Sequence, residues 1–353
     1  MAGGIGSRFW PVSKTAKPKQ FLDILGVGRT LIQQTFDRFK SIVPAENVLI
    51  VTNAIYEKII KEQLPEIPLS NILLEPYRRN TAPCIAYACY KIYELNPKAN
   101  IIVAPSDHLI LKEQEFLRVI GEGLDFVNKT DNLLTIGIHP SRPETGYGYI
   151  QISQEKASLN VGISKVKTFT EKPDLKLATV FYESGEFFWN SGIFLWRADT
   201  IIKALETHLS EVSSLFAEGR GIYNTKQEVA FIDKIYPVCK NISIDYGVME
   251  KASNVFVFCA DFGWSDLGTW GSLYEHSNKD DHNNSVKGEN IFLYDTKNCT
   301  IDIPNNKIIV VQGLDNYIVA ESENVMLICR LQDEQMIKQF VHDVKLKKGE
   351  EFV

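Results

Sequence analysis

The residues best suited by type and spacing to do chemistry lie at the start of the chain, where a glycine-rich run carries an arginine. The run reads Gly3-Gly4-Ile5-Gly6-Ser7-Arg8-Phe9-Trp10-Pro11, and Lys17-Pro18-Lys19-Gln20 follows it. Glycines let backbone N–H groups approach an anion closely. Arg8 adds a bidentate donor, and Lys19 adds a mobile positive charge. We therefore predict a phosphate-binding loop.

Other glycine-rich phosphate loops are excluded by their spacing. The run lacks the G-x-x-x-x-G-K-[ST] order, and no third glycine completes G-x-G-x-x-G. Asp23 lies near the distance at which a dinucleotide-binding fold carries its ribose-binding acid, but the basic run 17–20 intervenes. A dinucleotide-dependent oxidoreductase is therefore disfavoured.

Two aspartates stand where loops are expected. Asp107 follows a predicted strand at Asn100–Ala104, and Asp266 lies in the tight turn Trp264–Gly268. An isolated aspartate after a strand is commonly a turn or N-cap residue, so the residues alone leave their role open. His108 has no partner at metal-ligand spacing, which favours a packing or orienting role.

Short apolar runs rich in β-branched residues alternate with stretches of helical spacing. The strands are expected at Asn47–Thr52, Ile72–Glu75, Asn100–Ala104, Leu133–Ile138, Ser164–Thr170 and Gly192–Trp196, and helices at Leu31–Phe39 and Thr81–Leu95. This alternation predicts an α/β fold with a doubly wound, mostly parallel sheet (Rossmann-like). Such sheets bind ligands outside the carboxyl ends of their strands.

The pattern changes after the polar segment Lys279–Asn284, which we interpret as a linker. Short strands then alternate with Asn, Asp and Gly turns, and helix returns near Glu334–His342; the strands are expected at Ile291–Tyr294, Thr300–Ile303, Ile308–Val311, Tyr317–Ala320 and Val325–Cys329. We predict a catalytic domain over 1–278 and a small all-β, β-helix-like domain over 286–353.

Composition excludes several classes of protein. Of the 353 residues, 44% are hydrophobic, enough for a large core, and the net charge of −6 lacks the basic footprint of a nucleic-acid binder. The six cysteines form no C-x-x-C pair, and buried reduced thiols are expected. Neither a signal peptide nor a membrane-spanning run is evident, so we expect a cytoplasmic protein without a membrane partner.

The loop begins almost at Met1, whereas in a doubly wound sheet a central strand should precede it. We expect the natural protein to carry a short apolar segment upstream that forms this strand.

The opening motif, GGxGxR with the later PKQ, resembles the signature of the sugar-1-phosphate nucleotidyltransferases, and specifically their mannose-1-phosphate guanylyltransferase branch. Further stretches agree along nearly the whole chain: Asn80–Pro83, Pro105–His108, Arg142–Ile150, Glu171–Pro173, Trp189–Gly192 and Trp264–Gly268. The isomerase domain that longer family members carry is absent from this sequence.

The resemblance implies that a phosphate oxygen of mannose 1-phosphate attacks the α-phosphorus of GTP in line, releasing pyrophosphate and giving GDP-mannose. This nucleophile is already ionised, so the reaction needs alignment and charge neutralisation rather than a general base. The resemblance assigns Arg8 and Lys19 to catalysis, and Asp107 and Asp266 to catalysis and to binding Mg²⁺.

The resemblance also implies a sugar-phosphate site. Glu171 would accept mannose hydroxyls, Lys172 would pair with the phosphate, Asn190 would bind further hydroxyls, and Gly148 would let the backbone touch the sugar. An exposed Glu-Lys pair is usually only a solvated surface, but Pro173 fixes the turn that presents this one.

The nucleotide site would comprise Gly3, Gly4, Gly6, Ser7 and Arg8, together with Glu75, Asn80 and Thr81. Guanine offers two adjacent donors, which a carboxylate accepts, whereas glutamine would suit thymine or uracil. Glu75 could equally cap the following helix or pair with Arg78 or Arg79.

Two alternatives stay open within this family. One is a nucleotidyltransferase for another hexose 1-phosphate or nucleotide. The other is a non-catalytic nucleotide-sugar-binding relative, which should have lost some of the charged residues, whereas all are present: Arg8, Lys19, Asp107, Lys172 and Asp266. Oligomeric state cannot be read from the sequence, and a homodimer is one arrangement to test.

Overall fold

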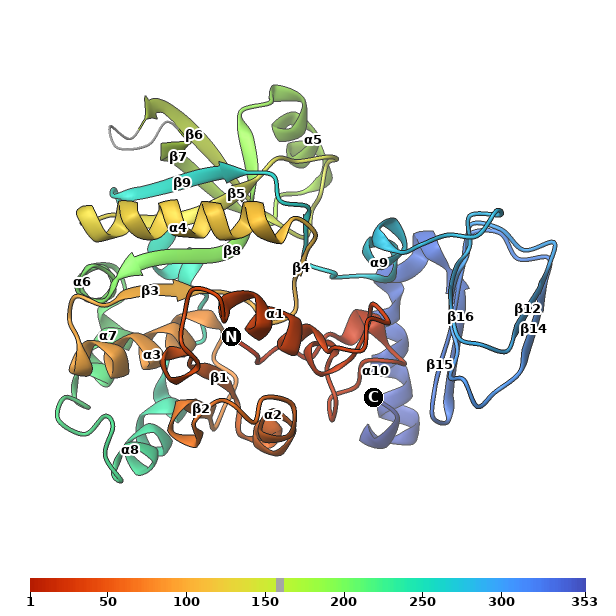
Figure 1. Cartoon of the computed structure of the whole chain (residues 1–353), viewed down its shortest axis with the longest axis horizontal. Helices are drawn as coiled ribbons and strands as arrows, with labels where there is room; N and C mark the ends of the chain where they lie inside the picture. The colour runs from red at the N-terminus through yellow and green to blue at the C-terminus, as the bar shows by residue number, and fades with distance from the viewer. Residues whose placement is uncertain (157–161) are drawn as a thin grey trace. The chain divides into compact units, whose positions relative to one another are not determined.

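A computed structural model describes residues 1–156 and 162–353 (Figure 1). The chain forms two compact units. The first unit comprises residues 1–3, 40–105 and 110–264, and the second comprises residues 4–39, 106–109 and 265–353. Residues 4–39 and 106–109 group with the C-terminal part of the chain, and the division of function between 1–278 and 286–353 stays a prediction.

The first unit is built on a six-stranded sheet with the order β3-β8-β5-β9-β7-β6. Its strands are β3 (Asn100–Val103), β5 (Leu133–Ile138), β6 (Gly148–Lys156), β7 (Ile163–Glu171), β8 (Phe187–Arg197) and β9 (Val255–Ala260). In the described part of the chain, β5 and β9 form its one parallel pair, while β3–β8, β5–β8, β6–β7, β6–β8 and β7–β9 are antiparallel.

The prediction of a mostly parallel sheet is therefore wrong for these six strands, although the α/β class is confirmed. The long strand β8 runs antiparallel to three neighbours, β3, β5 and β6. Local periodicity identifies a strand but neither its partner nor its direction. Strand–helix alternation gives parallel pairs only where each helix connects neighbouring strands.

Helices cover both faces of this sheet. Helix α4 (Glu113–Lys129) packs on one face, where Gly123 lies against Leu134 and Leu195. The opposite face carries Phe194 and Trp196 and packs on helices α3 (Thr81–Leu95), α6 (Ala198–His208) and α7 (Ser210–Ala217). Alternate residues of a strand point to opposite faces, so β8 is apolar on both and forms the centre of the unit.

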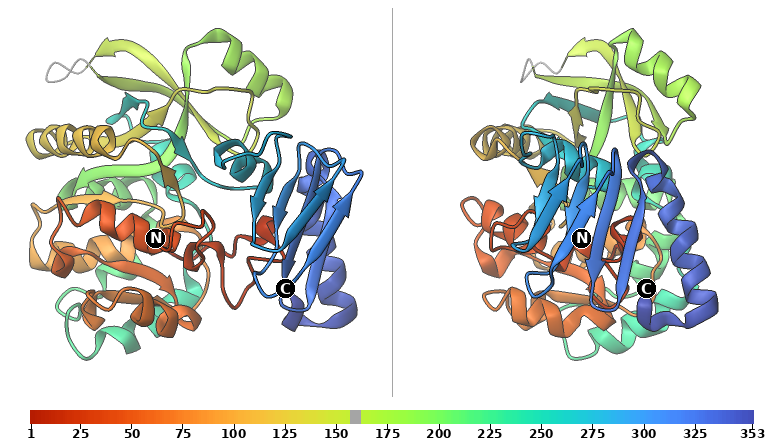
Figure 2. Two further views of the ribbon diagram at one scale, coloured as in Figure 1. Left: turned by 45° about the vertical axis from the view of Figure 1, so that its right-hand side comes forward. Right: turned by 90° about the vertical axis from the view of Figure 1, so that its right-hand side faces the viewer.

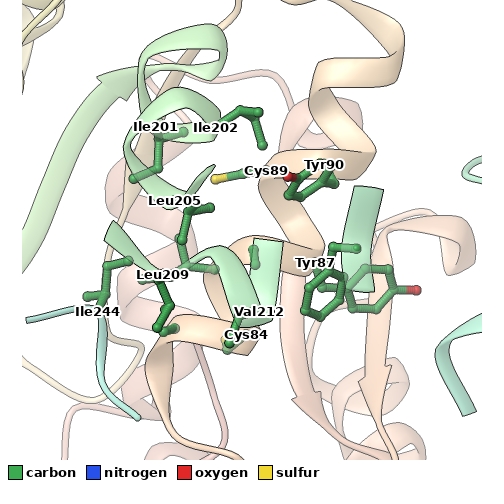
Figure 3. Packing of buried hydrophobic residues seen from close by; sticks show 14 of the residues in the cluster. Cys84, Tyr87, Cys89, Tyr90, Ile201, Ile202, Leu205, Leu209, Val212 and Ile244 are labelled. Atoms are coloured by element: carbon green, nitrogen blue, oxygen red, sulfur yellow. The ribbon is translucent and has the colours of Figure 1, made fainter. Parts of the chain in front are cut away.

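Figure 3 shows how α3 enters the main core of this unit. Cys84, Tyr87, Cys89 and Tyr90 of α3 lie among apolar side chains of α6 and α7 and are almost fully buried. Each large apolar side chain removed from water in this way stabilises the fold by about 1.5–3 kcal/mol. The cysteines are free thiols, as predicted.

The first unit also contains strands and helices outside the six-stranded sheet. Strands β1 (Ile50–Asn53) and β2 (Ile72–Glu75) form a separate parallel pair. The helices are α2 (Glu57–Gln63), α5 (Leu175–Ser184) and α8 (Glu228–Ile235). The first two residues of the chain contact strands on both sides, since the Ala2 N–H donates to Val51 of β1 and the Met1 amino group donates to Ala104 after β3.

The second unit contains a C-terminal β region. Successive strands alternate between two parallel sheets, because β11, β13 and β15 pair in one and β12 and β14 in the other. The strands are β11 (Ser285–Lys287), β12 (Ile291–Tyr294), β13 (Thr300–Asp302), β14 (Ile309–Gln312), β15 (Tyr317–Ser322) and β16 (Val325–Arg330), of which β16 pairs antiparallel with β15.

Helix α10 (Ile337–Lys348) packs beside this β region (Figure 2). Its residue Ile337 shares a buried cluster with Ile318 and Leu327 of β15 and β16. Helices α1 (Leu31–Phe39) and α9 (Trp270–His276) contribute to the same cluster through Leu31 and Trp270. The short strands β4 (Leu109–Ile110) and β10 (Trp264–Ser265) lie where the chain passes between the units. In the parts of the chain described, no helix is long and apolar enough to cross a membrane.

Candidate active site

The glycine-rich loop of the second unit has a shape that requires glycine at one position. Gly6 has φ +62°, and a Cβ there would lie 2.9 Å from Ser13 Oγ and 3.0 Å from Lys19 Cγ. Gln20 fixes the loop from the basic run by donating to the Gly4 carbonyl oxygen at 2.9 Å. The loop and the basic run are therefore one structure, as their proximity in the sequence suggests.

Arg8 follows Gly6 in the short 3-10 helix η1 (Ser7–Phe9). Phe9 is buried and anchors this turn, which leaves Ser7 and Arg8 partly exposed. The Arg8 Nη1 atom lies 3.5 Å from the Gly268 carbonyl oxygen, a long hydrogen bond. A guanidinium has five N–H donors, so this contact leaves most of its capacity to bind an anion.

Lys19 differs from the mobile charge that we predicted. Its side chain is buried, and its ammonium lies 3.1 Å from Asp107 Oδ2. The same group donates to the carbonyl oxygens of Asp266, at 2.7 Å, and Leu267, at 3.0 Å. An ammonium removed from water needs acceptors for its three N–H groups, and the Asp107 carboxylate and the two carbonyl oxygens supply them. Lys19 thus links the Asp107 carboxylate to the backbone of the turn that carries Asp266.

The surroundings of Asp107 keep it ionised. Burial alone would raise its pKa, but the Lys19 ammonium and the neighbouring His108 outweigh burial and hold that pKa below its ordinary value. His108 Nε2 lies 3.9 Å from Asp107 Oδ1, and burial lowers the pKa of His108 despite the nearby carboxylates of Asp107 and Asp266. This placement agrees with an orienting role for His108.

The turn that carries Asp266 is tightly constrained. Asp266 Oδ1 accepts the Gly268 N–H at 2.9 Å, and Leu267 has φ +43°. A Cβ at Gly268 would lie 2.5 Å from Asp266 Oδ2, so glycine is needed for the carboxylate to keep this position. Thr269 and Ser272 then form a capping box that begins α9 and fixes the end of the turn.

The donor set around Lys19 fits a hard divalent cation. One ammonium contacts the Asp107 carboxylate and the backbone carbonyl oxygen of Asp266, so the two aspartates lie near each other. A carboxylate has about four lone-pair sites. No cluster of three or more His, Cys, Asp or Glu side chains that could hold a metal occurs among residues 1–156 and 162–353. Mg²⁺ is typically held by one or two carboxylates and by substrate phosphates, so two suffice.

In the first unit, Glu75 ends strand β2 and is buried. Tyr236 donates its hydroxyl to Glu75 Oε1 at 2.6 Å, and burial raises the pKa of Glu75. Neither structural alternative for this residue is seen in the described residues. Asn80 caps the next helix, and the nearby arginines bind elsewhere, Arg78 to the Tyr56 hydroxyl and Arg79 to the Pro237 carbonyl oxygen.

Asn80 and Thr81 form the start of α3. Asn80 has φ +67°, and its Oδ1 accepts the Thr81 N–H at 2.9 Å. The Thr81 hydroxyl accepts the N–H of Ile244 at 2.9 Å. These bonds give both side chains a structural role, and their contact with a nucleotide stays a prediction.

Three of the predicted sugar-site residues meet at the end of the β6–β7 ladder. Gly148 and Glu171 are paired across the strands. Lys172, with φ +48°, donates its N–H to the Tyr147 carbonyl oxygen at 3.1 Å, and its ammonium forms an ion pair with Glu171. The Glu171 side chain is 10% exposed and that of Lys172 is 59% exposed. The pair is therefore half-buried in a shaped turn rather than on an open surface.

Asn190 lies beside this turn, in β8. A Cβ at Gly148 would lie 3.4 Å from the Asn190 Cβ. Asn190 Oδ1 accepts the Thr135 hydroxyl at 3.0 Å and the Gly192 N–H at 3.3 Å, while its Nδ2 donates to Asp245 Oδ1 at 2.8 Å. All four predicted sugar-site residues, at 148, 171, 172 and 190, thus lie in one cluster.

Aromatic side chains border this cluster. The rings of Tyr147 and Trp189 meet edge to face at 5.1 Å, and those of Tyr147 and Trp264 at 5.2 Å. Arg142 lies over the Trp189 ring at 5.6 Å. Trp189 and Trp264 are buried and form part of the wall of this cluster.

Sequence reasoning missed Thr135 and Asp245. Thr135 belongs to an otherwise apolar strand, and a single threonine there carries no functional signal. Asp245 begins η7 (Asp245–Met249), a π-helical turn, which is rare and often found at functional sites. A turn of this kind has no sequence pattern that would reveal it.

The predicted site residues thus fall into two groups, each inside one unit. Loop residues Gly4–Arg8, Lys19 and the two aspartates belong to the second unit, and Gly3 and the base and sugar candidates belong to the first. A tight glycine loop, two aspartates near one buried ammonium and an α/β sheet are the features expected of a nucleotidyl transferase. The family model for nucleotidyl transferases matches residues 1–283, and the chain belongs to this family.

Named relatives make the comparison more specific. The chain is 36% identical over 363 residues to the mannose-1-phosphate guanylyltransferase of Salmonella montevideo, covering 100% of this chain and 74% of that protein. It is 37% identical over 346 residues to the alginate biosynthesis protein AlgA of Pseudomonas putida, covering 97% and 70%. The structure is similar to a Thermus thermophilus protein named mannose-1-phosphate geranyltransferase, with a TM-score of 0.87, 27% identity and 98% coverage of both chains.

Proposed function

We propose that this protein transfers GMP from GTP to mannose 1-phosphate, giving GDP-mannose and pyrophosphate. The observation that carries the proposal is the Lys19 ammonium, which is buried between the Asp107 carboxylate and the carbonyl oxygens of Asp266 and Leu267. A network of this kind, beside a glycine loop with Arg8, is suited to a polyphosphate and its cation. The relatives named for guanylyl transfer to mannose 1-phosphate support the choice of substrates.

The second unit supplies the groups for the nucleotide triphosphate. Backbone N–H groups of Gly4, Gly6 and Ser7 and the Arg8 guanidinium bind phosphate oxygens. Lys19 holds the pKa of Asp107 below its ordinary value and fixes the backbone of the turn that carries Asp266. Asp107 and Asp266 would hold Mg²⁺, which supplies charge neutralisation at the α-phosphate when bound.

The first unit supplies the groups for the acceptor. Lys172 binds the phosphate of mannose 1-phosphate, and Glu171 and Asn190 bind its hydroxyls. Because Gly148 has no side chain, the backbone of this turn can contact the sugar ring directly. The nucleophile is a phosphate oxygen that is already ionised at neutral pH. The protein therefore acts by aligning two anions, without a general base.

Glu75 is our candidate for reading guanine. An ionised carboxylate presents acceptors only, matching the N1–H and N2–H₂ donors of guanine. Its bond to Tyr236 uses one lone pair and fixes the side chain. Asn80 and Thr81 would contact the nucleotide at the start of α3, where backbone N–H groups favour an anion.

We propose that residues 1–278 carry the catalytic function and that 286–353 form a β-helix-like domain. The alternation of β11 to β15 between two parallel sheets supports that description of the C-terminal segment.

Two alternatives are tested by the same assay. Pyrophosphate release is measured with GTP or dTTP against mannose, glucose and fucose 1-phosphates. GTP with mannose 1-phosphate should give the highest kcat/KM. A higher kcat/KM with another pair would reassign the substrates, and no release with any pair would favour a non-catalytic sugar-nucleotide-binding protein.

A further inference from the structure

A carboxylate that the proposed mechanism does not use lies inside the sugar cluster. Asp245 Oδ1 accepts the Asn190 Nδ2–H at 2.8 Å. The residue comes from the π-helical turn η7, far in sequence from β6, β7 and β8, which provide the other groups. Burial raises the pKa of Asp245 to about 6, and the Glu171 carboxylate adds to this effect.

The contacts of Asn190 explain what Asp245 does. An ionised carboxylate can only accept, so it must face the NH₂ end of the amide, and the Gly192 N–H can only donate, so it must face the oxygen. The Thr135 hydroxyl, which can donate or accept, would tolerate either orientation. Asp245 and Gly192 therefore fix the orientation of the Asn190 amide, with Nδ2 toward the carboxylate and Oδ1 toward the Gly192 N–H. Among the described residues, the second Nδ2–H has no protein acceptor.

A second carboxylate near Glu171 is costly unless donors are supplied. Like charges repel at short range, and both groups are removed from most of the solvent. Lys172 forms an ion pair with Glu171, whereas the side-chain group that donates to Asp245 is the uncharged Asn190 amide. A ligand rich in hydroxyl groups supplies further O–H donors, whereas an anionic ligand alone would not.

We propose that Asp245 is a positioning residue of the sugar-phosphate site, which holds the Asn190 amide in the orientation that offers an N–H to a hexose hydroxyl. The proposal rests on the proposed function, since it takes a hexose 1-phosphate as the ligand of this cluster. It adds a residue on which recognition of the sugar, but not of the nucleotide, depends.

The test compares KM values for the two substrates in Asp245→Ala and Asp245→Asn, with Asp125→Asn as the matched control. Asp125 is an exposed aspartate of helix α4 in the same unit. Asp245→Ala should raise the KM for mannose 1-phosphate by roughly 10–100-fold, the loss of one charge-assisted bond, and change the KM for GTP by less than about twofold. Asp245→Asn should recover part of this loss, because its amide oxygen can still accept from Asn190.

Direct binding of mannose 1-phosphate, followed by Trp fluorescence, and the melting temperature accompany the kinetics. An unchanged KM for mannose 1-phosphate in both folded variants would overturn the inference while wild-type turnover left the proposed function intact. Equal rises in both KM values would show a structural role and would also overturn it. If the wild-type protein neither binds nor uses mannose 1-phosphate, the proposed function and this inference both fail.

Discussion

Gly148 lies directly opposite Glu171 across the β6–β7 ladder, and a Cβ at position 148 would come within 2.4 Å of Glu171 Oε2. The shortest contact involves the far end of a flexible side chain, so an added methyl group would displace the carboxylate. The Phe169 ring, at 3.3 Å from this Cβ, would have to give by only a few tenths of an ångström, and the Asn190 Cβ lies at 3.4 Å. The Glu171 carboxylate can therefore keep its observed position only because residue 148 has no side chain.

We expect Gly148→Ala to lower kcat/KM for mannose 1-phosphate by roughly 10–100-fold, as for the loss of one charged hydrogen bond. The melting temperature should change little, since the methyl group meets a movable side chain. Steady-state kinetics and calorimetry check this. Full activity in the variant would show that Glu171 does not need its observed position.

Asp107→Asn and Asp266→Asn should each reduce turnover by about 10²–10³-fold, the usual effect of losing one preorganised group that stabilises charge. Asparagine keeps the size of the side chain, and at 266 it can still accept the Gly268 N–H, so the fold should survive. Asp343→Asn, at an exposed position of helix α10, serves as the control. Near wild-type turnover in either site variant, with metal still bound, would remove that residue from the proposed metal site.

Arg8→Ala and Lys172→Ala should produce different defects. Loss of Arg8 removes a donor for the triphosphate, and loss of Lys172 removes the partner of the sugar phosphate; each should cost about 1.5–3 kcal/mol in its own step. KM and kcat measured separately for GTP and mannose 1-phosphate distinguish the two. The same defect toward both substrates in both variants would contradict the division of roles between the units.

Glu75→Gln should lower the preference for GTP over dTTP or UTP, because it exchanges an acceptor for a donor. A bidentate contact to a base is worth about 1–3 kcal/mol of discrimination. Competition between nucleotides for mannose 1-phosphate measures the change, with Tyr236→Phe as a companion that removes the hydroxyl bonded to Glu75. An unchanged preference would move base recognition to the backbone near Asn80–Ala82.

Asp245 should make the stability of the fold depend on pH. Its pKa is about 6 in the folded protein against 3.8 as the ordinary value, so the folded state binds a proton more tightly than the unfolded state. The free energy of unfolding of the wild-type protein should therefore fall as pH rises from about 4 to 6, and this contribution should stay constant above pH 6. The charged groups that face Asp245 are the Glu171 carboxylate, which adds to the rise of its pKa, and the Lys172 ammonium, which opposes it. Glu250 lies near enough for Asp245 and Glu171 to raise its own pKa.

Asp245→Asn should remove this dependence and be more stable than wild type at pH 7, by on the order of 1–3 kcal/mol. The difference should vanish near pH 4. Denaturant unfolding of both proteins between pH 4 and 8 measures it. Parallel stability curves for the two proteins would contradict the raised pKa.

Sequence patterns predicted local structure well here. Helices α1 and α3 have the predicted bounds, Leu31–Phe39 and Thr81–Leu95, because their apolar spacing and the Asn80 cap are local features. The direction of β8 was not predictable in the same way, since its partners β3, β5 and β6 come from distant parts of the chain.

The candidate site shows the same limit. The glycine loop, Glu171 and Lys172 stand out because their chemistry is written in short motifs. Asp245 does not, because its role comes from a π-helical turn that places it against Asn190. Lys19 was predicted as a charge but not as a buried one, since burial depends on Asp107 and the carbonyl oxygens of the 266–267 turn.

The most direct test of the account is to follow labelled phosphorus through the reaction. The protein is incubated with Mg²⁺, mannose 1-phosphate and GTP labelled either at the α- or at the γ-phosphorus, and the products are separated by chromatography. The account predicts that the α-label appears in GDP-mannose and the γ-label in pyrophosphate, in equal amounts. Release of the γ-label as inorganic phosphate with no labelled sugar nucleotide would contradict it.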